Sequence, residues 1–250
     1  MTTARQWRVS GDVRGPLQAR VSDIDGLNEL FSEAFTERYR RDGMMGVRVP
    51  QLNPAMWRYA IYDAEGGALH WRGDRDEIVA FNIAHHSGAE GWMGPLAVRP
   101  EWQGSGLGKE VVRAGIAWLE TQGSAVIGLE TMPRTMDNIG FYSGLGFLPG
   151  RLTLTLTLDA DAAEGAPTLL SRASARTRDD LVDACRKLTH EQIAGYDYSR
   201  EIRLTAELGL GDTLAFERAG KLVGFALFHS ASLVEGRARC GTRQCRPEAF

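Results

Sequence analysis

Apolar and polar residues alternate along this chain with a period that changes from helical to extended and back. From Asp23 to about Arg40 the apolar residues recur at helical spacing, which predicts an amphipathic helix capped by Asp23. Pro54–Asp63 predicts a second helix, because proline suits the first helical position. The alternating segment Arg151–Leu158 (RLTLTLTL) predicts a strand instead, because side chains two residues apart share one face of a sheet.

The segments between these elements predict further strands and two further helices. The strands cover Leu17–Val21, Ala68–Arg72, Glu77–His85, Trp92–Val98 and Ala125–Glu130, and the helices cover Leu107–Thr121 and Thr135–Leu145. Helices and strands interspersed in this way, with most strands in the middle, predict an α/β (α+β mixed) fold.

A break in the pattern divides the chain near Asp159–Pro167 (DADAAEGAP), which is small, acidic and interrupted by glycine and proline. Such a composition is typical of a linker, and also of a long surface loop inside one domain. An internal repeat favours the linker. Ile78–His85 has the apolar pattern of Leu222–His229, and Val21–Phe31 resembles Ala175–Cys185, in the same order along the chain.

We interpret the repeat as two copies of one fold, of which the second is incomplete. The first domain is then expected at residues 1–160 and the second at residues 168–250. The alternative is that short apolar strands resemble one another without common origin.

The composition is that of a globular protein and argues against several functional classes. Of the 250 residues, 43% are hydrophobic and 24% charged, which allows a buried core. The formal net charge of −3 lacks the basic excess of nucleic-acid-binding proteins. No apolar run is long enough to cross a membrane, and the polar N-terminus lacks the apolar centre of a secretory signal. We therefore expect neither a nucleic-acid nor a membrane partner.

The cysteines indicate a reducing compartment. Three are present, Cys185, Cys240 and Cys245, and an odd number without a secretory signal favours free thiols and a cytoplasmic location. Cys240 and Cys245 have no neighbouring histidine pattern, so we expect no metal site.

A glycine-rich turn between a predicted strand and a predicted helix is the most informative segment. It comprises Gln103, Gly104, Ser105, Gly106, Leu107, Gly108 and Lys109. Glycines at the start of a helix let backbone N–H groups converge on an anion, and the helix dipole adds positive charge there. The turn is therefore expected to bind a phosphate or pyrophosphate.

Two familiar nucleotide-binding loops do not fit this spacing. In a G-x-x-x-x-G-K-[ST] loop, Gly104 would be one position too close, and Glu110 replaces the hydroxyl that binds magnesium. In a G-x-G-x-x-G loop, Lys109 stands where the third glycine is needed. The spacing thus disfavours a nucleotide triphosphatase and a dehydrogenase.

The spacing that does fit is Q-x-x-G-x-G, at Gln103, Gly106 and Gly108. It resembles the loop that holds the pyrophosphate of coenzyme A in the GNAT superfamily of acetyltransferases, and the preceding strand has the V-x-P ending of that family. Residues 138–147 (NIGFYSGLGF) are similar to the family's N-x-x-x-Y-x-x-x-G-F segment. The resemblance covers about residues 17–158.

For the fold, this resemblance implies a splayed, mainly antiparallel mixed sheet flanked by helices. The step Gly94-Pro95 inside a predicted strand agrees with a bulge that splays the sheet, and a ragged edge strand is the alternative. No Q-x-x-G-x-G follows Gly108, so the second copy is expected to be a partial GNAT-like lobe without a cofactor site.

For the cofactor, the resemblance implies acetyl-CoA. The backbone of Leu96, Ala97 and Val98 would pair with the amide-bearing arm of coenzyme A, next to the phosphate-binding turn. Asn138 keeps its place in the second motif, whereas Thr135 departs from the asparagine that many members carry there.

The chemistry implied is direct attack of a primary amine of a small molecule or peptide on the acetyl thioester. A backbone N–H near Leu96–Ala97 would stabilise the oxyanion. Tyr142 is the candidate general acid, because a tyrosine pKa of about 10 lies close to that of a thiol; an aromatic side chain packed at a helix end is the alternative. Glu90 is the candidate base, directly or through water. His85 and His86 are further candidates, and an amine that arrives deprotonated needs none.

The acceptor side is expected to be walled by Phe35–Tyr62, where Arg38, Arg40 and Arg41 stand near aromatic residues. Such a wall suits an acidic or aromatic amine, and the same residues equally suit a solvated helix end followed by core aromatics. The second lobe would shape the acceptor cleft, brace the first lobe or support a homodimer. The rival function is a regulatory or scaffolding module that binds acyl-CoA without turnover, against which an intact Tyr142 argues.

Overall fold

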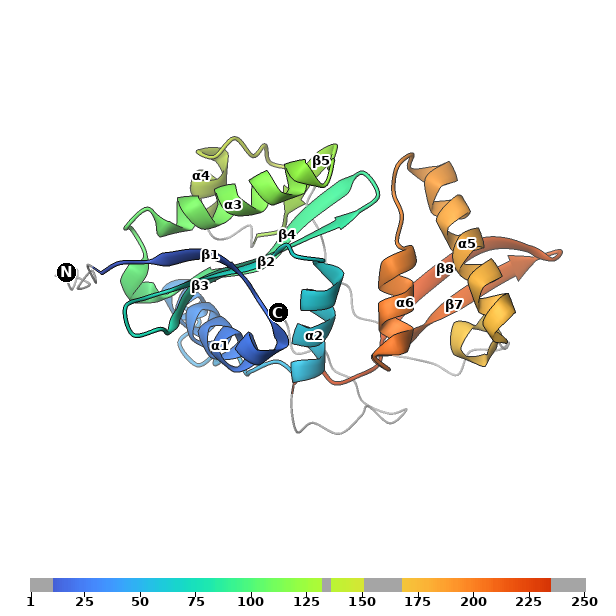
Figure 1. The fold of residues 1–250 in the computed structure, drawn as a ribbon, viewed down its shortest axis with the longest axis horizontal. Helices are drawn as coiled ribbons and strands as arrows, with labels where there is room; N and C mark the ends of the chain where they lie inside the picture. Colours follow the sequence, from blue (N-terminus) through green and yellow to red (C-terminus); the bar gives the residue numbers. More distant parts are fainter. Residues whose placement is uncertain (1–10, 132–135, 151–167, 235–250) are drawn as a thin grey trace. The chain divides into compact units, whose positions relative to one another are not determined.

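The computed structural model describes residues 11–131, 136–150 and 168–234 (Figure 1). The chain forms two compact units, Met1–Phe147 and Leu148–Phe250, and each is treated by itself. The predicted strand Arg151–Leu158, the departure at Thr135 and the cysteines Cys240 and Cys245 lie outside the described residues.

The first unit contains a five-stranded sheet with the order β1-β2-β3-β4-β5. Its strands are β1 (Arg14–Gln18), β2 (Ala68–Arg72), β3 (Ile78–Ser87), β4 (Glu90–Val98) and β5 (Val126–Leu129). All neighbouring strands are antiparallel except β4 and β5, which are parallel. The predicted mainly antiparallel mixed sheet is thereby confirmed.

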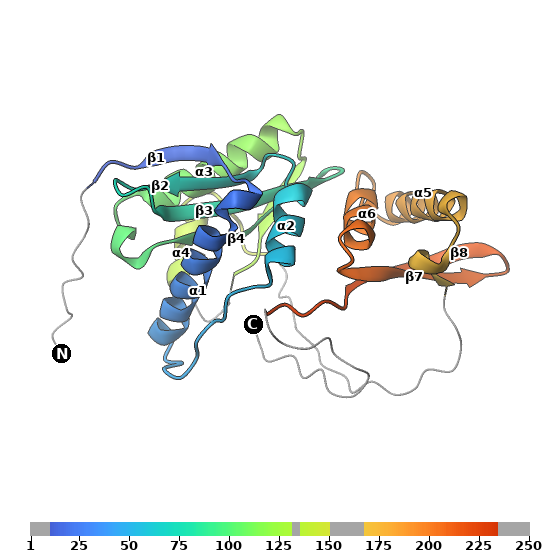
Figure 2. The same ribbon diagram turned by 60° about the horizontal axis from the view of Figure 1, so that its bottom comes forward.

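Helices cover both faces of this sheet (Figure 1, Figure 2). The helices α1 (Ile24–Arg41) and α2 (Pro54–Asp63) lie on one face, and α3 (Leu107–Thr121) and α4 (Met136–Ser143) lie on the other. This arrangement places the glycine-rich turn, which precedes α3, at the end of the sheet where β4 stops.

The core between the sheet and the first pair of helices is aromatic. Trp57 of α2 and Phe81 of β3 are almost fully buried, and their rings meet edge to face at 5.5 Å between centroids. Phe31 of α1 packs against the same tryptophan at 6.0 Å. Edge-to-face pairs of this kind add about 0.5–1.5 kcal/mol beyond burial, so they fix α1 and α2 firmly on β3.

Local signals placed several elements correctly. The helices Pro54–Asp63 and Leu107–Thr121 and the strand Ala68–Arg72 have the predicted bounds. At the first of these helices the side chain of Asn53 accepts a hydrogen bond from the N–H of Ala55 at 3.0 Å, which caps the helix as proline opens it.

The start of the chain differs from the prediction. The first strand is Arg14–Gln18 rather than Leu17–Val21, and a short 3-10 turn, Val21–Asp23, follows it. Asp23 does stand at the N-terminus of α1, but its carboxylate does not cap that helix. Instead it accepts from the N–H of Arg20 at 2.8 Å and pairs with Arg72 of β2 at 2.7 Å, because the sheet brings that guanidinium within reach.

The second unit has a three-stranded antiparallel sheet, β6-β7-β8, and two main helices. Its elements are β6 (Thr168–Leu169), α5 (Ala175–Gln192), α6 (Ser199–Glu207), β7 (Gly211–Arg218) and β8 (Lys221–His229). The order strand, 3-10 turn, 18-residue helix, shorter helix and hairpin is the order in which the first unit begins.

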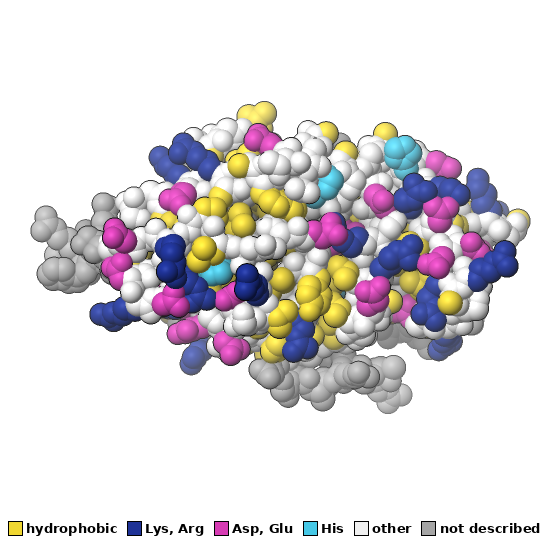
Figure 3. Space-filling view, in the orientation of Figure 1, with side chains coloured by type: hydrophobic (Ala, Val, Ile, Leu, Met, Phe, Trp, Pro, Cys, Tyr) yellow, Lys and Arg dark blue, Asp and Glu magenta, His cyan; other side chains and the backbone are white. Residues whose placement is uncertain are grey.

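The outer faces of α5 and α6 are solvated. Lys and Arg side chains alternate there with Asp and Glu (Figure 3). Asp183 pairs with Arg186 and Lys187 along α5, each at 2.6 Å, and Asp179 pairs with Arg203 of α6 at 2.9 Å. These ion pairs join acidic and basic side chains along α5 and between α5 and α6.

Candidate functional site

The sheet opens at a bulge in β4. Asn82 of β3 faces Leu96 of β4 and Ala84 faces Met93, so Gly94 and Pro95 together oppose a single residue of β3. Gly94 has a φ of +151°, a value that favours glycine. The bulge that the Gly94-Pro95 step predicted is therefore present.

The bulge coincides with the end of the pairing between β4 and β5. Paired residues run from Glu90 with Val126 to Met93 with Leu129, and among the described residues no strand continues this pairing beyond Met93. Past the bulge, the β5-side edge of β4 thus has no strand partner within residues 11–131, 136–150 and 168–234, which agrees with the splay that the resemblance implied.

The register determines which backbone groups point into this opening. The N–H of Arg99 donates to the carbonyl of Val79 at 2.8 Å, so Arg99 faces β3. Because successive residues of a strand direct their N–H and C=O groups to opposite sides, Ala97 also faces β3, whereas Leu96 and Val98 face the opening. Of the two residues proposed for the oxyanion contact, Leu96 has the suitable orientation.

The glycine-rich turn is held in place by its own polar side chains. Nε2 of Gln103 donates to the carbonyl of Val98 at 3.0 Å, which ties the turn to the end of β4. The hydroxyl of Ser105 donates to the carbonyl of Trp102 at 2.6 Å and lies 3.3 Å from the N–H of Leu107. The side chains of Gln103 and Ser105 are therefore used to shape the turn.

The backbone donors of the turn remain available. Within the described part of the chain, the N–H groups of Gly104, Ser105, Gly106 and Gly108 make no hydrogen bond to the protein. Gly104 and Gly106 have φ values of +77° and +102°, which favour glycine and turn the chain into the start of α3. A Cβ on Gly106 would meet no atom within 4 Å, so the space beside this residue is open. Unpaired backbone donors ahead of a helix N-terminus are typical of an anion site.

Two other residues of the turn have different roles. Leu107 is buried against the core at 6% exposure and anchors the start of α3. The side chain of Lys109 is exposed and forms no ion pair with any described residue, so its charge is available near the anion site.

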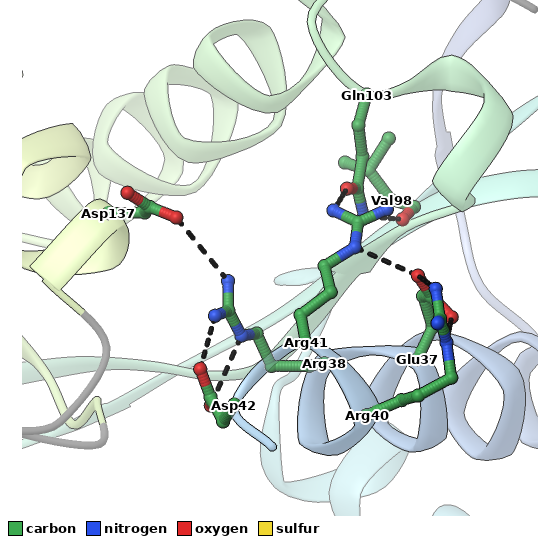
Figure 4. A network of polar contacts seen from close by, with 8 residues as sticks. All are labelled: Glu37, Arg38, Arg40, Arg41, Asp42, Val98, Gln103 and Asp137. Carbon is green, nitrogen blue, oxygen red and sulfur yellow. Dashed lines mark hydrogen bonds and ion pairs between the residues drawn. The ribbon is translucent and has the colours of Figure 1, made fainter. Parts of the chain in front are cut away.

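The end of α1 meets this turn (Figure 4). Arg41 donates through Nη1 to Oε1 of Gln103 at 2.7 Å and through Nε to Glu37 at 2.9 Å. Arg40 also binds Glu37, at 2.6 and 2.7 Å. The hydrogen bonds from these two arginines lower the pKa of the Glu37 carboxyl to about 2, and the bond from Arg40 has the larger effect.

Arg38 reaches across to the other face of the sheet. Its guanidinium binds both carboxylate oxygens of Asp42 and lies 4.0 Å from Asp137 of α4 (Figure 4). Arg38 and Arg41 therefore line the side of the opening between α1 and α4. The acceptor wall predicted from the sequence includes these arginines, but no local pattern reveals the contact of Arg41 with Gln103.

Tyr142 lies in the hydrophobic cluster that borders the opening. Its ring contacts Phe141 and Phe147, at 5.1 and 6.0 Å between centroids, and it shares a cluster with Leu96. Burial raises the pKa of Tyr142 to about 12. Its hydroxyl makes no hydrogen bond to the described residues, so a protonated phenol is available here at neutral pH.

The remaining predicted residues have definite positions. Asn138 donates through Nδ2 to the hydroxyl of Thr131 at 3.1 Å, and so ties α4 to the segment that follows β5. Glu90 begins β4, whereas Leu96 lies past the bulge, on the order of 20 Å away along a strand. The structure does not bring Glu90 beside Leu96.

Comparison with protein families finds one match. Residues 25–147 match the model of the "Acetyltransferase (GNAT) family". This range contains the bulge in β4, the glycine-rich turn and Tyr142. The search of curated proteins finds no match.

The fold of this chain is also similar to that of several solved structures of low sequence identity. A provisionally assigned acetyltransferase from Pyrococcus horikoshii is 15% identical over 87% of this chain and 72% of its own, with a TM-score of 0.57. The ribosomal-protein-S18-alanine N-acetyltransferase from Escherichia coli is 18% identical over 57% of this chain and 80% of its own, with a TM-score of 0.43. Ard1 from Thermoplasma volcanium is 16% identical over 57% of this chain and 86% of its own, with a TM-score of 0.44.

In the portion that the structure describes, no helix has the length and apolar character needed to traverse a bilayer. Residues 11–131, 136–150 and 168–234 also contain no cluster of His, Cys, Asp and Glu arranged to hold a metal ion.

Proposed function

Because residues 25–147 form a domain of the GNAT acetyltransferase family, whose members use acetyl-CoA as acyl donor, we propose that this protein transfers an acetyl group to a primary amine of a small molecule or peptide by direct attack. The observation that carries the proposal is the opening of the sheet after Gly94 next to a turn with four unused N–H donors. A single extended ligand can thus bind both the edge of β4 and the N-terminus of α3.

The phosphate end of the donor suits the glycine-rich turn. The N–H groups of Gly104, Ser105, Gly106 and Gly108 would bind the pyrophosphate of coenzyme A, and the ammonium of Lys109 would add a positive charge.

The amide-bearing arm suits the open edge of β4. Leu96 and Val98 turn their backbone groups toward the opening, and the carbonyl of Val98 is already bound by Gln103. The N–H and C=O of Leu96 and the N–H of Val98 have no partner in the described part of the chain and therefore remain to pair with the arm. The same N–H of Leu96 is suited to stabilise the oxyanion that forms as the thioester is attacked, a contribution of a few kcal/mol in comparable sites.

Tyr142 is proposed as the general acid for the departing thiolate. The support is its place in the cluster with Leu96, its hydroxyl, which forms no hydrogen bond to a described residue, and its raised pKa, which keeps the phenol protonated at neutral pH. A protonated group within reach of the leaving sulfur is what this step requires.

The acceptor is proposed to enter beside α1 and the segment that follows it. Met45 and Val47 are exposed apolar side chains of this segment, and Arg38 lies at its edge. Since Arg38 is paired with Asp42, we expect an amine on an apolar or aromatic body to be preferred over a polyanion.

Release of free coenzyme A thiol tests the proposed function. The full chain is incubated with acetyl-CoA and a panel of aliphatic, aromatic and peptidyl amines, and the thiol is measured against a sample without amine. Amine-dependent release with formation of the N-acetyl product supports an enzyme. Binding of acetyl-CoA without release for any amine would favour the rival, a regulatory or scaffolding module that binds acyl-CoA.

The second unit is proposed to be a partial GNAT-like lobe that carries no donor site. Support comes from the element order it shares with the start of the first unit, and from a structural likeness that covers 87% of the chain. Light scattering of the full chain tests whether this lobe supports a homodimer: a mass near twice 27.5 kDa supports that role, and a monomer contradicts it.

A further inference from the structure

A histidine and a buried aspartate face each other on the acceptor side of the sheet. Nδ1 of His85, in β3, lies 3.2 Å from Oδ2 of Asp63, the last residue of α2. The side chain of Asp63 is 3% exposed, whereas that of His85 is 32% exposed. One edge of the imidazole is therefore anchored inside the protein, and the ring reaches the surface.

The packing of α2 on the sheet produces this contact. Trp57 and Ile61 are buried on β3, and Asp63 and Ala64 follow them into the interior at the end of the helix. A buried carboxylate is costly unless it is hydrogen bonded or paired. His85 supplies such a partner to Asp63, so the pair is part of the interface between α2 and β3.

The strand register places His85 near the opening. His85 faces Trp92 of β4, and the next pair, Ala84 with Met93, borders the bulge. Asn82, which faces Leu96, lies three positions back along β3, or about 10 Å. An imidazole reaches several ångströms from its strand, so an amine placed between Leu96 and His85 is within contact of both.

The alternation of β3 directs His85 to the acceptor side. Phe81 and Ile83 pack in the core formed by α1 and α2, and His85 continues that face. Ala84 packs in the cluster below α3, on the opposite face. His86 follows the direction of Ala84 and therefore points away from the acceptor.

We propose that His85, oriented by Asp63, is the group that takes the proton from the acceptor amine. This inference rests on the proposed acetyl transfer. When Nδ1–H donates to the carboxylate of Asp63, Nε2 carries a lone pair on the edge of the ring that points away from Asp63. Asp63 is a positioning residue, because it acts through the imidazole.

The reaction balances with these groups. An acceptor that arrives as an ammonium first loses one proton to Nε2 of His85, which passes it to solvent. The neutral nitrogen then attacks the thioester carbonyl carbon, so that a C–N bond forms and the C–S bond breaks. The second proton of the nitrogen goes to Nε2, and the thiolate takes a proton from Tyr142, which is restored from solvent. For an acceptor that enters as an ammonium, the products are the N-acetyl amide, free coenzyme A and one proton, which is released to solvent.

Nitrogen-detected NMR of the histidines in the full wild-type chain is the first test. The geometry predicts that neutral His85 has its proton on Nδ1, and that Asp63→Asn weakens this preference. A proton on Nε2 of His85 in the wild type would overturn the proposal, and this result needs neither a variant nor an acceptor.

Turnover of variants is the second test. His85→Gln is compared with His86→Gln, the same change at the neighbouring position on the opposite face. Rates are measured with the best amine of the panel, or with water as acceptor if no amine is used, and the affinity for acetyl-CoA is measured by calorimetry. We expect His85→Gln to lower the rate about 100-fold, within the range for general base catalysis. His86→Gln is expected to retain the rate.

Rescue separates a catalytic from a structural role. Added imidazole should restore part of the rate of His85→Ala, and it should not accelerate His86→Ala. An unchanged rate for His85→Gln with normal acetyl-CoA binding would refute the role of His85 while leaving the acetyltransferase proposal intact. A folded wild-type chain that neither binds nor cleaves acetyl-CoA would remove both.

Discussion

Arg41, at the end of α1, donates a 2.7 Å hydrogen bond to Oε1 of Gln103, in the glycine-rich turn. The other end of the same glutamine side chain binds the carbonyl of Val98. Gln103 thus bridges α1 and the open edge of β4, and the shape of the anion site depends on a helix some sixty residues earlier in the chain.

Replacing Arg41 should weaken donor binding. A hydrogen bond from a charged group contributes about 1.5 kcal/mol or more, so Arg41→Met is expected to raise the Kd for acetyl-CoA about 10-fold. The matched control is Arg40→Met, which removes the same charge from a side chain that binds Glu37 and not Gln103. Equal calorimetric Kd values for the two variants would contradict the bridging role.

Two glycine substitutions should have opposite results. Gly106→Ala forces a side chain onto a φ of +102°, at a cost on the order of 1–3 kcal/mol, and is expected to distort the turn and abolish detectable binding of acetyl-CoA. In Gly108→Ala the new Cβ lies 3.5 Å from the ring of Phe141, an ordinary contact, and alanine favours a helix.

Gly108→Ala should therefore keep its affinity for acetyl-CoA and unfold at the same temperature as the wild type or a higher one. Calorimetry and thermal unfolding of both variants check this pair. Retained binding in Gly106→Ala would argue against the turn as the donor site.

Removing the phenol of Tyr142 should affect turnover and leave binding unchanged. Tyr142→Phe keeps the ring contacts with Phe141 and Phe147, and loses only the hydroxyl. We expect kcat to fall about 100-fold, as is typical for loss of a general acid, with the Kd for acetyl-CoA unchanged. A steady-state rate equal to that of the wild type would show that solvent protonates the thiolate.

The raised pKa of Tyr142 should appear in alkaline stability. The folded chain loses this proton at about pH 12 and the unfolded chain at about pH 10, so folding favours the protonated form. Its contribution to the free energy of unfolding is complete below about pH 10 and declines as the pH rises toward about 12, by at most about 3 kcal/mol. Urea unfolding across this range should show a smaller decline in Tyr142→Phe than in Tyr62→Phe, which removes an exposed phenol.

Local chemistry made several elements predictable. Proline at position 54 and the glycines before α3 act within a few residues, so the bounds of α2 and α3 follow from the sequence. The first strand lies earlier in the chain than predicted, because its position depends on pairing with β2. Asp23 does not cap α1 as predicted, because it pairs with Arg72, which is distant in the sequence.

The site shows the same division between local and distant contacts. The turn is predictable from Gly106 and the bulge from the Gly94-Pro95 step, because each imposes a backbone conformation by itself. The bridge from Arg41 to Gln103 and the pair of His85 with Asp63 arise only when helices pack on the sheet in one register. No pattern within the sequence encodes which of several polar residues will meet.

Calorimetric titration of the full chain with acetyl-CoA, and separately with ATP and NAD, tests the central claim most directly. We predict one site per chain for acetyl-CoA, lost in Gly106→Ala, and no heat of binding for ATP or NAD. A folded chain that does not bind acetyl-CoA, or that binds ATP or NAD equally well, would contradict the assignment of the turn and of the open edge of β4 as an acetyl-CoA site.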